Sequence, residues 1–198
     1  IHVDNRALNG RSTRSFRNEG HWELVRKKLR KGDYVFIQFG HNDQKADTAR
    51  HSDAETDYKI NLGKYIDETR KVGAIPVLFT PIVRRKFNPN GTLADTHGKY
   101  TDAVRTVAKE KQVLLIDLNK MSAGLLEKYG PEKSTSLFVW VEPGIYAALP
   151  KGKQDNTHLN VRGARLIARM VAEAIKETIP ALAPHIVMYD YVVAKDGS

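Results

Sequence analysis

Three short and nearly continuous apolar runs stand out along the chain, at residues 34–39, 75–80 and 113–117. Runs of this length that are rich in β-branched and aromatic residues are typical of strands buried on both faces of a parallel sheet. Between them, apolar residues recur at helical spacing over residues 58–69 and 100–108. This alternation predicts βαβ units with right-handed crossovers, and therefore an α/β fold with a parallel sheet.

A long amphipathic stripe near the C-terminus predicts one further helix. Asn160 is suited to cap its N-terminus, and Pro180 is suited to end it. Residues 81–99 and 130–157 are marked by proline and glycine, and we interpret both as long loops, which in compact domains are often functional. The apolar positions of the stripe are Val161, Ala164, Ile167, Val171, Ala174 and Ile175.

The two ends of the chain also carry strand-like segments. Residues 1–5 (IHVDN) indicate the beginning of a strand, and residues 185–198 indicate another, after the proline-containing segment IPALAPH. We therefore expect one domain over residues 1–184, followed by a linker and the first strand of a further domain over residues 185–198.

Polar clusters follow the strands, where a parallel sheet would place a ligand. In the segment NRALNGRSTRSF, Gly10 allows a sharp turn and leaves its N–H free to face a ligand. In the segment FGHND, Gly40 allows a tight turn, and the Asn42 amide can donate a hydrogen bond to a developing oxyanion. Asp43 is suited to hold this loop by accepting backbone N–H groups. The alternatives are a polar strand-to-helix loop for the first segment and an Asx-turn for the second.

The third cluster, DNTHLN, precedes the last helix and holds Asp155 and His158 three residues apart. In a loop, the aspartate can fold back and accept a hydrogen bond from one ring nitrogen. This contact fixes the tautomer and leaves the other nitrogen free to act as a general base. The alternative is an aspartate that caps the helix beside an incidental histidine. His97 and Arg84, both in the long loop over residues 81–99, are candidates for contact with substrate.

Composition narrows the function classes. The 198 residues contain no cysteine, which excludes disulfides, thiol catalysis and cysteine–zinc sites, and no apolar run approaches the length of a membrane-spanning helix. Lys and Arg number 32 against 23 Asp and Glu, a net charge of +9. This excess favours an acidic partner such as nucleic acid or an acidic polysaccharide, although a solvated basic surface without a specific partner is equally compatible with it.

The three clusters, in this order, resemble the sequence blocks of the SGNH (GDSL-like) hydrolases and, within them, the rhamnogalacturonan acetylesterases. NRALNGRSTRSF is similar to the glycine block of that subgroup, FGHND to its G-x-N-D block, and KQDNTHLNVRGA to its D-x-x-H block. Residues 80–100 and 137–158 also resemble the subgroup, so the likeness covers roughly residues 1–184. The resemblance implies a three-layer α/β/α, flavodoxin-like fold and no cofactor.

By this resemblance, Asp155 and His158 are the acid and base of a catalytic triad, and the Gly10 N–H and the Asn42 amide are two of three oxyanion donors. The implied reaction removes acetyl groups from a pectic polysaccharide, rhamnogalacturonan. The galacturonate of that polymer is acidic, which matches the positive charge of the chain. A secreted or periplasmic location is implied, with no nucleic-acid partner and no membrane contact.

One block of the family has no counterpart in the sequence, namely the G-D-S motif that carries the nucleophilic serine at the end of the first strand. Ser12 and Ser15 lie in the glycine block and are not positional substitutes. In the family sheet order 2-1-3-4-5, the missing strand lies between two others, so we expect a gap in the sheet and little esterase activity from these 198 residues alone. The tail YDYVVAKDGS resembles the opening strand of pectin methylesterases, which indicates a second pectin-active domain in the parent protein.

Two alternatives from other classes stay open. A metal-dependent hydrolase would use His41, Asp43, Asp155 and His158, which are acceptable ligand types. A binding module for polyanions or carbohydrates, without catalytic activity, would account for the charge. The basic–aromatic interleaving typical of nucleic-acid binding does not occur in the sequence.

Overall fold

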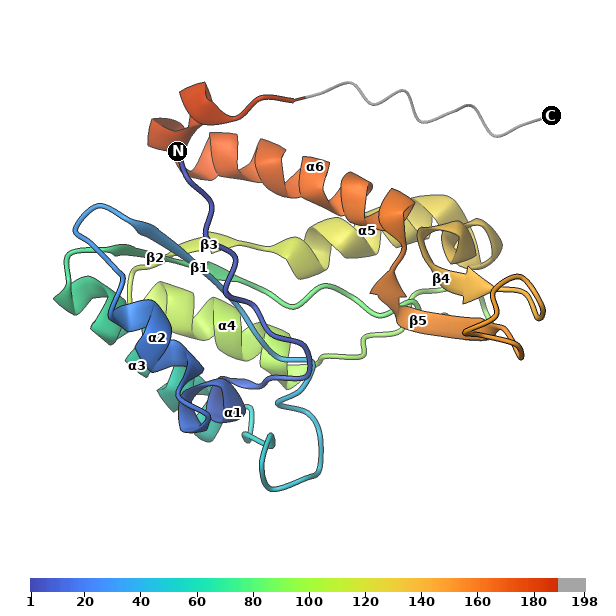
Figure 1. Ribbon diagram of the computed structural model, residues 1–198, viewed down its shortest axis with the longest axis horizontal. Coiled ribbons are helices and arrows are strands. Elements are labelled where there is room, and N and C mark those ends of the chain that lie inside the picture. Colours follow the sequence, from blue (N-terminus) through green and yellow to red (C-terminus); the bar gives the residue numbers. More distant parts are fainter. Residues whose placement is uncertain (189–198) are drawn as a thin grey trace.

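The three predicted strands form one parallel sheet in the computed structural model, which describes residues 1–188 (Figure 1). They are β1 (Tyr34–Gln38), β2 (Ile75–Phe79) and β3 (Leu114–Ile116), arranged in the order β1-β2-β3. Gln38 pairs with Phe79, and Phe79 pairs with Ile116, so the three strands end at one edge of the sheet. The segments that follow the strands therefore emerge at this edge.

Helices cover one face of the sheet and agree only in part with the sequence pattern. The two longer ones match the helical spacing noted above, whereas the two short ones were not predicted. They are α1 (Thr13–Asn18), α2 (His21–Arg26), α3 (Asp57–Lys71) and α4 (Lys99–Glu110). The core between these helices and the sheet includes Phe16, Trp22, Ile37, Tyr58, Leu62, Ile66, Leu78 and Val104.

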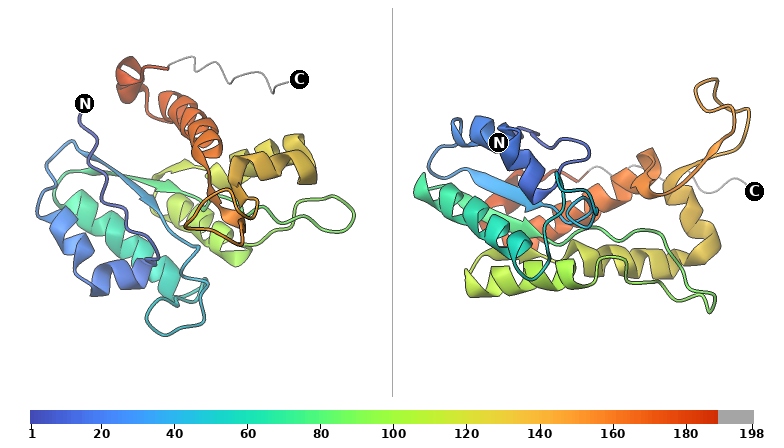
Figure 2. Two further views of the ribbon diagram at one scale, coloured as in Figure 1. Left: turned by 45° about the vertical axis from the view of Figure 1, so that its right-hand side comes forward. Right: turned by 90° about the horizontal axis from the view of Figure 1, so that it is seen from below.

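The opposite face is covered by α5 (Leu118–Lys133) and α6 (Val161–Thr178). As predicted, Asn160 caps α6 by accepting a hydrogen bond from the Gly163 N–H, and the helix ends before Pro180. The core on this side includes Val77, Phe79, Ile116, Leu118, Ile167, Val171 and Ile175. Apolar side chains are thus buried on both faces, and the three-layer α/β/α architecture is confirmed (Figures 1 and 2).

A hairpin occupies most of the segment that we expected to be a loop over residues 130–157. After the 3-10 turn η1 (Ser134–Leu137), strand β4 (Phe138–Val141) pairs antiparallel with β5 (Lys153–Leu159), and their connection projects from the body of the molecule (Figure 2). The expectation was wrong because the base of the hairpin has its own small core, which proline and glycine around it obscured in the sequence. This core includes Val83, Leu126, Leu137, Phe138, Trp140 and Leu159.

The two ends of the chain do not form the strands that the sequence predicted within the described residues. Residues 1–8 form no strand, and Ile1 and Val3 are 75% and 83% exposed, because this segment has no neighbouring strand to pair with. The predicted strand over residues 1–5 is therefore wrong, and β1 is an edge strand in the sheet of residues 1–188. The gap that we expected from a strand outside these residues stays a prediction. At the other end, the 3-10 segment η2 (Pro180–His185) is followed by three residues without helix or strand. The rest of the tail over residues 185–198 lies outside the described residues. Among residues 1–188, no helix has the length and apolar character needed to span a membrane.

Candidate active site

The loop after β1 is folded around Gly40 and Asp43. Gly40 has φ +130°, as the predicted tight turn requires, and a Cβ atom at this position would lie 3.1 Å from the Pro81 ring. The buried Asp43 carboxylate accepts hydrogen bonds from the Gly40 N–H at 3.1 Å and from the Thr13 N–H and hydroxyl at 3.0 and 2.5 Å. Asp43 holds this loop as predicted. Burial raises its pKa, although these hydrogen bonds oppose that effect.

The glycine block lies against the same loop. Thr13 begins α1, so its hydrogen bonds to Asp43 draw the start of this helix toward the loop. The Asn42 amide donates a hydrogen bond to the carbonyl oxygen of Arg11 at 3.2 Å, one residue beyond Gly10, which has φ +75°. An amide carries two N–H donors, so Asn42 keeps a second one for a ligand. The two candidate oxyanion donors therefore belong to adjoining loops.

Asp155 and His158 lie on a bulge of β5. Between two successive pairs of the β4–β5 ladder, β4 advances two residues while β5 advances five, from Gln154 to Leu159. The surplus residues leave the ladder and fold back on themselves. One oxygen of Asp155 accepts the N–H groups of Thr157 and His158, each at 2.8 Å, and the other lies 2.8 Å from His158 Nδ1. The pairing predicted from the D-x-x-H spacing therefore occurs, on a bulge rather than in a loop.

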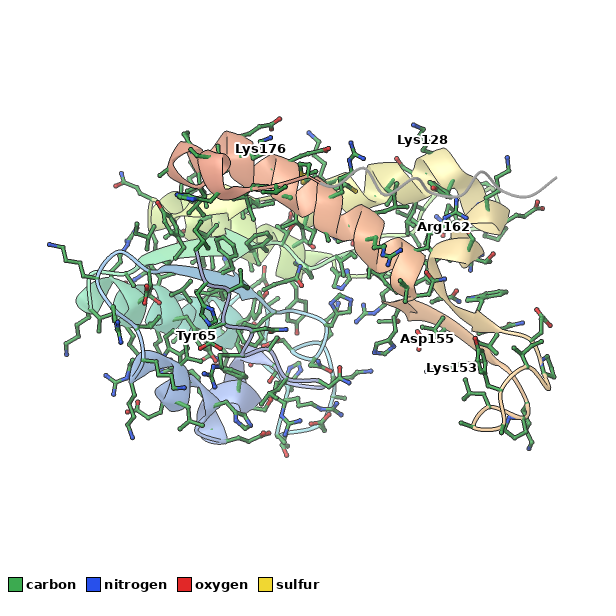
Figure 3. All side chains as sticks on the ribbon, turned by 45° about the horizontal axis from the view of Figure 1, so that its top comes forward. Tyr65, Lys128, Lys153, Asp155, Arg162 and Lys176 are labelled. Atoms are coloured by element: carbon green, nitrogen blue, oxygen red, sulfur yellow. The ribbon has the colours of Figure 1, made fainter. Side chains whose placement is uncertain are left out.

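The pair combines a shielded carboxylate with an accessible ring. The Asp155 side chain is 11% exposed, whereas that of His158 is 64% exposed. Lys153 Nζ lies 3.1 Å from Asp155, and Figure 3 shows both residues at the root of the hairpin. Burial alone would raise the pKa of Asp155. The N–H groups of His158 and Thr157, the His158 ring and the Lys153 ammonium outweigh it, and the pKa falls well below its usual range. The aspartate is therefore ionised and able to orient the ring.

Two further histidines stand beside this pair. The rings of His41 and His97 meet edge to face, with their centroids 4.4 Å apart. Burial, aided by neighbouring positive charge, lowers the pKa of His41 to about 3 and that of His97 to about 4. Both rings are therefore neutral at pH 7. The Arg85 N–H donates a hydrogen bond to the Asn156 carbonyl oxygen and Arg84 donates one to the His41 carbonyl oxygen, which places the D-x-x-H bulge near the FGHND loop.

Arg84 joins the FGHND loop to the loop over residues 81–99. Its guanidinium donates hydrogen bonds to the Gln44 side chain at 2.8 Å and to the carbonyl oxygens of Thr96 and His41 at 3.1 and 3.3 Å. Burial lowers its pKa. Of the two predicted substrate candidates, Arg84 is thus fixed beside the FGHND loop, whereas His97 is only 2% exposed and its Nε2 is buried without a hydrogen-bond partner.

Three residues that the sequence analysis missed hold the bulge in place. The side-chain oxygen of Asn156 accepts hydrogen bonds from Arg85 Nη1 at 2.8 Å and Trp140 Nε1 at 3.0 Å. The Asn156 carbonyl oxygen accepts the Arg85 N–H at 2.8 Å. These residues come from three separate segments, so no spacing along the chain signalled them.

The described residues include neither a metal-binding cluster nor a serine hydrogen-bonded to His158. No group of three or more His, Asp or Glu side chains in residues 1–188 is arranged to hold a metal ion, and Asp43 gives both its oxygens to Thr13 and Gly40, so the metal-site hypothesis finds no support. Nor is any serine in this range hydrogen-bonded to His158, because each makes other contacts. Ser12 and Ser15 cap α1, Ser52 lies beside Thr13, Ser122 and Ser136 donate to helix carbonyls, and Ser134 accepts from Arg85.

A parallel sheet with helices on both faces, a paired histidine and aspartate, and N–H donors in adjoining loops are features expected of a carboxylic ester hydrolase with a three-layer α/β/α fold. The sequence pattern of the GDSL-like Lipase/Acylhydrolase family matches residues 1–166. The chain belongs to this family, and its three-layer α/β/α architecture is the flavodoxin-like fold of the SGNH hydrolases.

Known relatives agree with this assignment. Rhamnogalacturonan acetylesterase RhgT of Bacillus subtilis (strain 168) is 42% identical over 185 residues, which are 93% of this chain and 78% of the relative. The probable rhamnogalacturonan acetylesterase YesY of the same organism is 35% identical over 178 residues, 89% of this chain and 77% of the relative. Among solved structures, protein YxiM from Bacillus subtilis has a TM-score of 0.73 at 29% identity and covers 89% of this chain and 46% of that one. The relatives support a carbohydrate esterase.

Proposed function

We propose that this protein removes acetyl groups from an acidic pectic polysaccharide of the rhamnogalacturonan type. The observation that carries the proposal is the Asp155–His158 pair, in which a shielded carboxylate holds Nδ1 of an exposed imidazole at 2.8 Å. With Nδ1 engaged, Nε2 is the nitrogen available to take a proton from a nucleophile. Two relatives that carry rhamnogalacturonan acetylesterase in their names support this substrate class.

The reaction proceeds by acyl transfer to a serine that lies outside these 198 residues. His158 takes the serine proton as the oxygen attacks the acetyl carbonyl, and Asp155 stabilises the imidazolium. The tetrahedral intermediate collapses when His158 protonates the departing sugar oxygen, leaving an acetyl-serine. Water, deprotonated by the same ring, then attacks the acetyl group and releases acetate and the free serine.

The oxyanion is held by neutral N–H donors. The Gly10 N–H and the free N–H of the Asn42 amide provide two of them, and the N–H of the external serine provides the third. One such donor typically contributes about 2.7–4 kcal/mol to lowering the barrier. Arg84 belongs to the substrate side of the site, whereas His97 is buried beneath it. Arg84 has N–H groups beyond those that it donates to protein oxygens, so it can also donate to a ligand. The ring of the buried His97 packs edge to face against the His41 ring.

The acidic polymer also accounts for the charge of the chain. A net charge of +9 concentrates galacturonate carboxylates at the protein surface. Because the proposed substrate is an extracellular polysaccharide, we place the protein in the periplasm or outside the cell.

The test compares two forms of the protein on acetylated rhamnogalacturonan, with acetate release as the measurement. One form is the 198-residue chain, and the other is extended by the residues encoded immediately before Ile1. We expect activity only in the extended form. There, Asp155→Asn lowers kcat by about 10⁴-fold, because the ring loses the partner that fixes its tautomer. Asp47→Asn, which removes an exposed carboxylate paired with Arg50, is the control and leaves kcat unchanged.

The outcomes separate the parts of the proposal. His158-dependent acetate release by the 198-residue chain alone would show that the nucleophile lies within it. Absence of acetate release from both forms, with folded protein confirmed by circular dichroism, would overturn the esterase proposal itself.

A further inference from the structure

We propose that Arg85 is a positioning residue for the Asp155–His158 pair and acts through Asn156; this inference rests on the function proposed above. Asn156 lies inside the bulge, directly after Asp155 and two residues before His158. Its carbonyl oxygen and its side-chain oxygen both accept hydrogen bonds from Arg85, each at 2.8 Å. Arg85 therefore contacts the bulge at its centre.

The guanidinium of Arg85 is itself fixed from several sides. Nε donates a hydrogen bond to Ser134 Oγ at 3.0 Å, and Nη2 donates one to the Pro131 carbonyl oxygen. The group also stacks over the Trp140 ring, 4.8 Å from its centroid. Each nitrogen of the planar fork thus has a different partner, which a lysine ammonium could not reproduce. Arg85 joins the end of α5, strand β4 and the bulge into one unit.

The bulge needs such an anchor because the ladder does not supply one. From Gln154 to Leu159, β5 has no successive pairing with β4 to set the position of the backbone. The His158 side chain is 64% exposed, so its own packing does not fix the ring. A displacement of about 1 Å at a reacting group can lower a rate by about 10²-fold. The anchor on Asn156 therefore bears directly on catalysis.

The residue before Arg85 holds the opposite half of the site. Arg84 donates a hydrogen bond to the carbonyl oxygen of His41 at 3.3 Å, and His41 directly precedes the candidate oxyanion donor Asn42. Two consecutive arginines thus connect the loop of the oxyanion donor with the bulge of the general base. Arg85 provides the hydrogen bonds of this connection to the bulge.

The experiment uses two variants and a matched control. Arg85→Lys keeps the positive charge but loses the fork, and Asn156→Ala removes the side-chain acceptor. Lys86→Ala removes a positive charge at the exposed neighbouring position and is the control. In the extended form of the protein, we expect both variants to lower kcat by about 10- to 100-fold with less than threefold change in KM, because orientation rather than binding is lost. The double variant should be no less active than the less active single variant, because both substitutions remove the same hydrogen bond between Arg85 Nη1 and the Asn156 side-chain oxygen.

A second readout is independent of activity. Nitrogen-15 NMR of the His158 ring in the 198-residue chain reports its tautomer, and the contact with Asp155 favours the proton on Nδ1. We expect the two variants, but not Lys86→Ala, to shift the ring toward a mixture of tautomers, while urea unfolding shows that the chain remains folded. If neither kcat nor the tautomer changes, or if kcat falls with an unchanged tautomer, Arg85 has no positioning role. If the tautomer shifts but no form of the protein hydrolyses the polymer, the Arg85 inference stands and the proposed function fails.

Discussion

At the scale of single residues, the site depends on how charge is distributed among buried and exposed groups. Asp155 is ionised because N–H donors surround it, and this ionised carboxylate orients the exposed His158 ring. His41 and His97 behave in the opposite way, since burial beside Arg84 keeps both rings neutral. The D-x-x-H spacing predicted the first pair. It gave no sign of the second, because the two histidines are far apart in the sequence and are joined only by the fold.

The neutral histidines predict a loss of stability in mild acid. The pKa of His97 is lowered to about 4, whereas in the unfolded chain a histidine titrates near 6.5. The unfolded state therefore takes up the proton first, and the free energy of unfolding falls as the pH drops from about 6.5 toward 4. In urea unfolding experiments across this range, we expect His97→Gln to make stability less dependent on pH. His51→Gln, at an exposed position, is the control and should leave the slope as it is. An unchanged slope in His97→Gln would contradict this assignment.

At the scale of elements, some helices and strands could be predicted from the local sequence pattern, whereas others depend on tertiary packing. The apolar runs and the stripe of α6 could be predicted because each carries its own periodicity. The β4–β5 hairpin could not, because its small core is assembled from Val83, Leu126 and Phe138 on separate segments. The close approach of α6 to this core was equally hidden. A Cβ atom on Gly163 would lie 2.0 Å from the Leu137 carbonyl oxygen.

The contact at Gly163 predicts a marked difference between two helical glycines. In Gly163→Ala, the added methyl group must push α6 away from η1, and we expect a loss of about 1–3 kcal/mol in the free energy of unfolding. Gly124, in α5, has no atom within 4 Å of a built Cβ. Gly124→Ala should therefore raise the free energy of unfolding by about 0.5–1 kcal/mol through helix propensity. Chemical denaturation of both variants measures the two effects, and equal effects at the two positions would refute the close approach.

At the scale of the whole molecule, the positive charge separates an esterase for an acidic polymer from a general binder of polyanions. Long-range attraction between exposed charges weakens as salt rises, since the Debye length is about 10 Å at 0.1 M and about 3 Å at 1 M. The net charge of +9 therefore contributes to binding of any polyanion at low salt. Contacts made within the site should persist when this attraction is screened.

This difference gives a prediction for binding. In isothermal titration at low salt, we expect acetylated rhamnogalacturonan and duplex DNA both to bind. At about 0.5 M salt, where screening is strong, only the pectic polymer should remain bound. Deacetylated polymer is the control and should bind more weakly at high salt than the acetylated form. Equal retention of DNA and pectic polymer would favour the non-catalytic polyanion-binding alternative.

The sequence by itself determined the parallel sheet, the long helices and the identity of the paired Asp155 and His158. Periodicity and short spacings involve residues close together in the sequence, so they can be recognised without knowing the tertiary contacts. Only the tertiary structure decided that residues 1–8 form no strand, that the pair lies on a bulge of β5, and that Arg85 anchors it through Asn156. Those features depend on partners brought together from distant segments, and the free energy of such contacts exists only once the chain has folded.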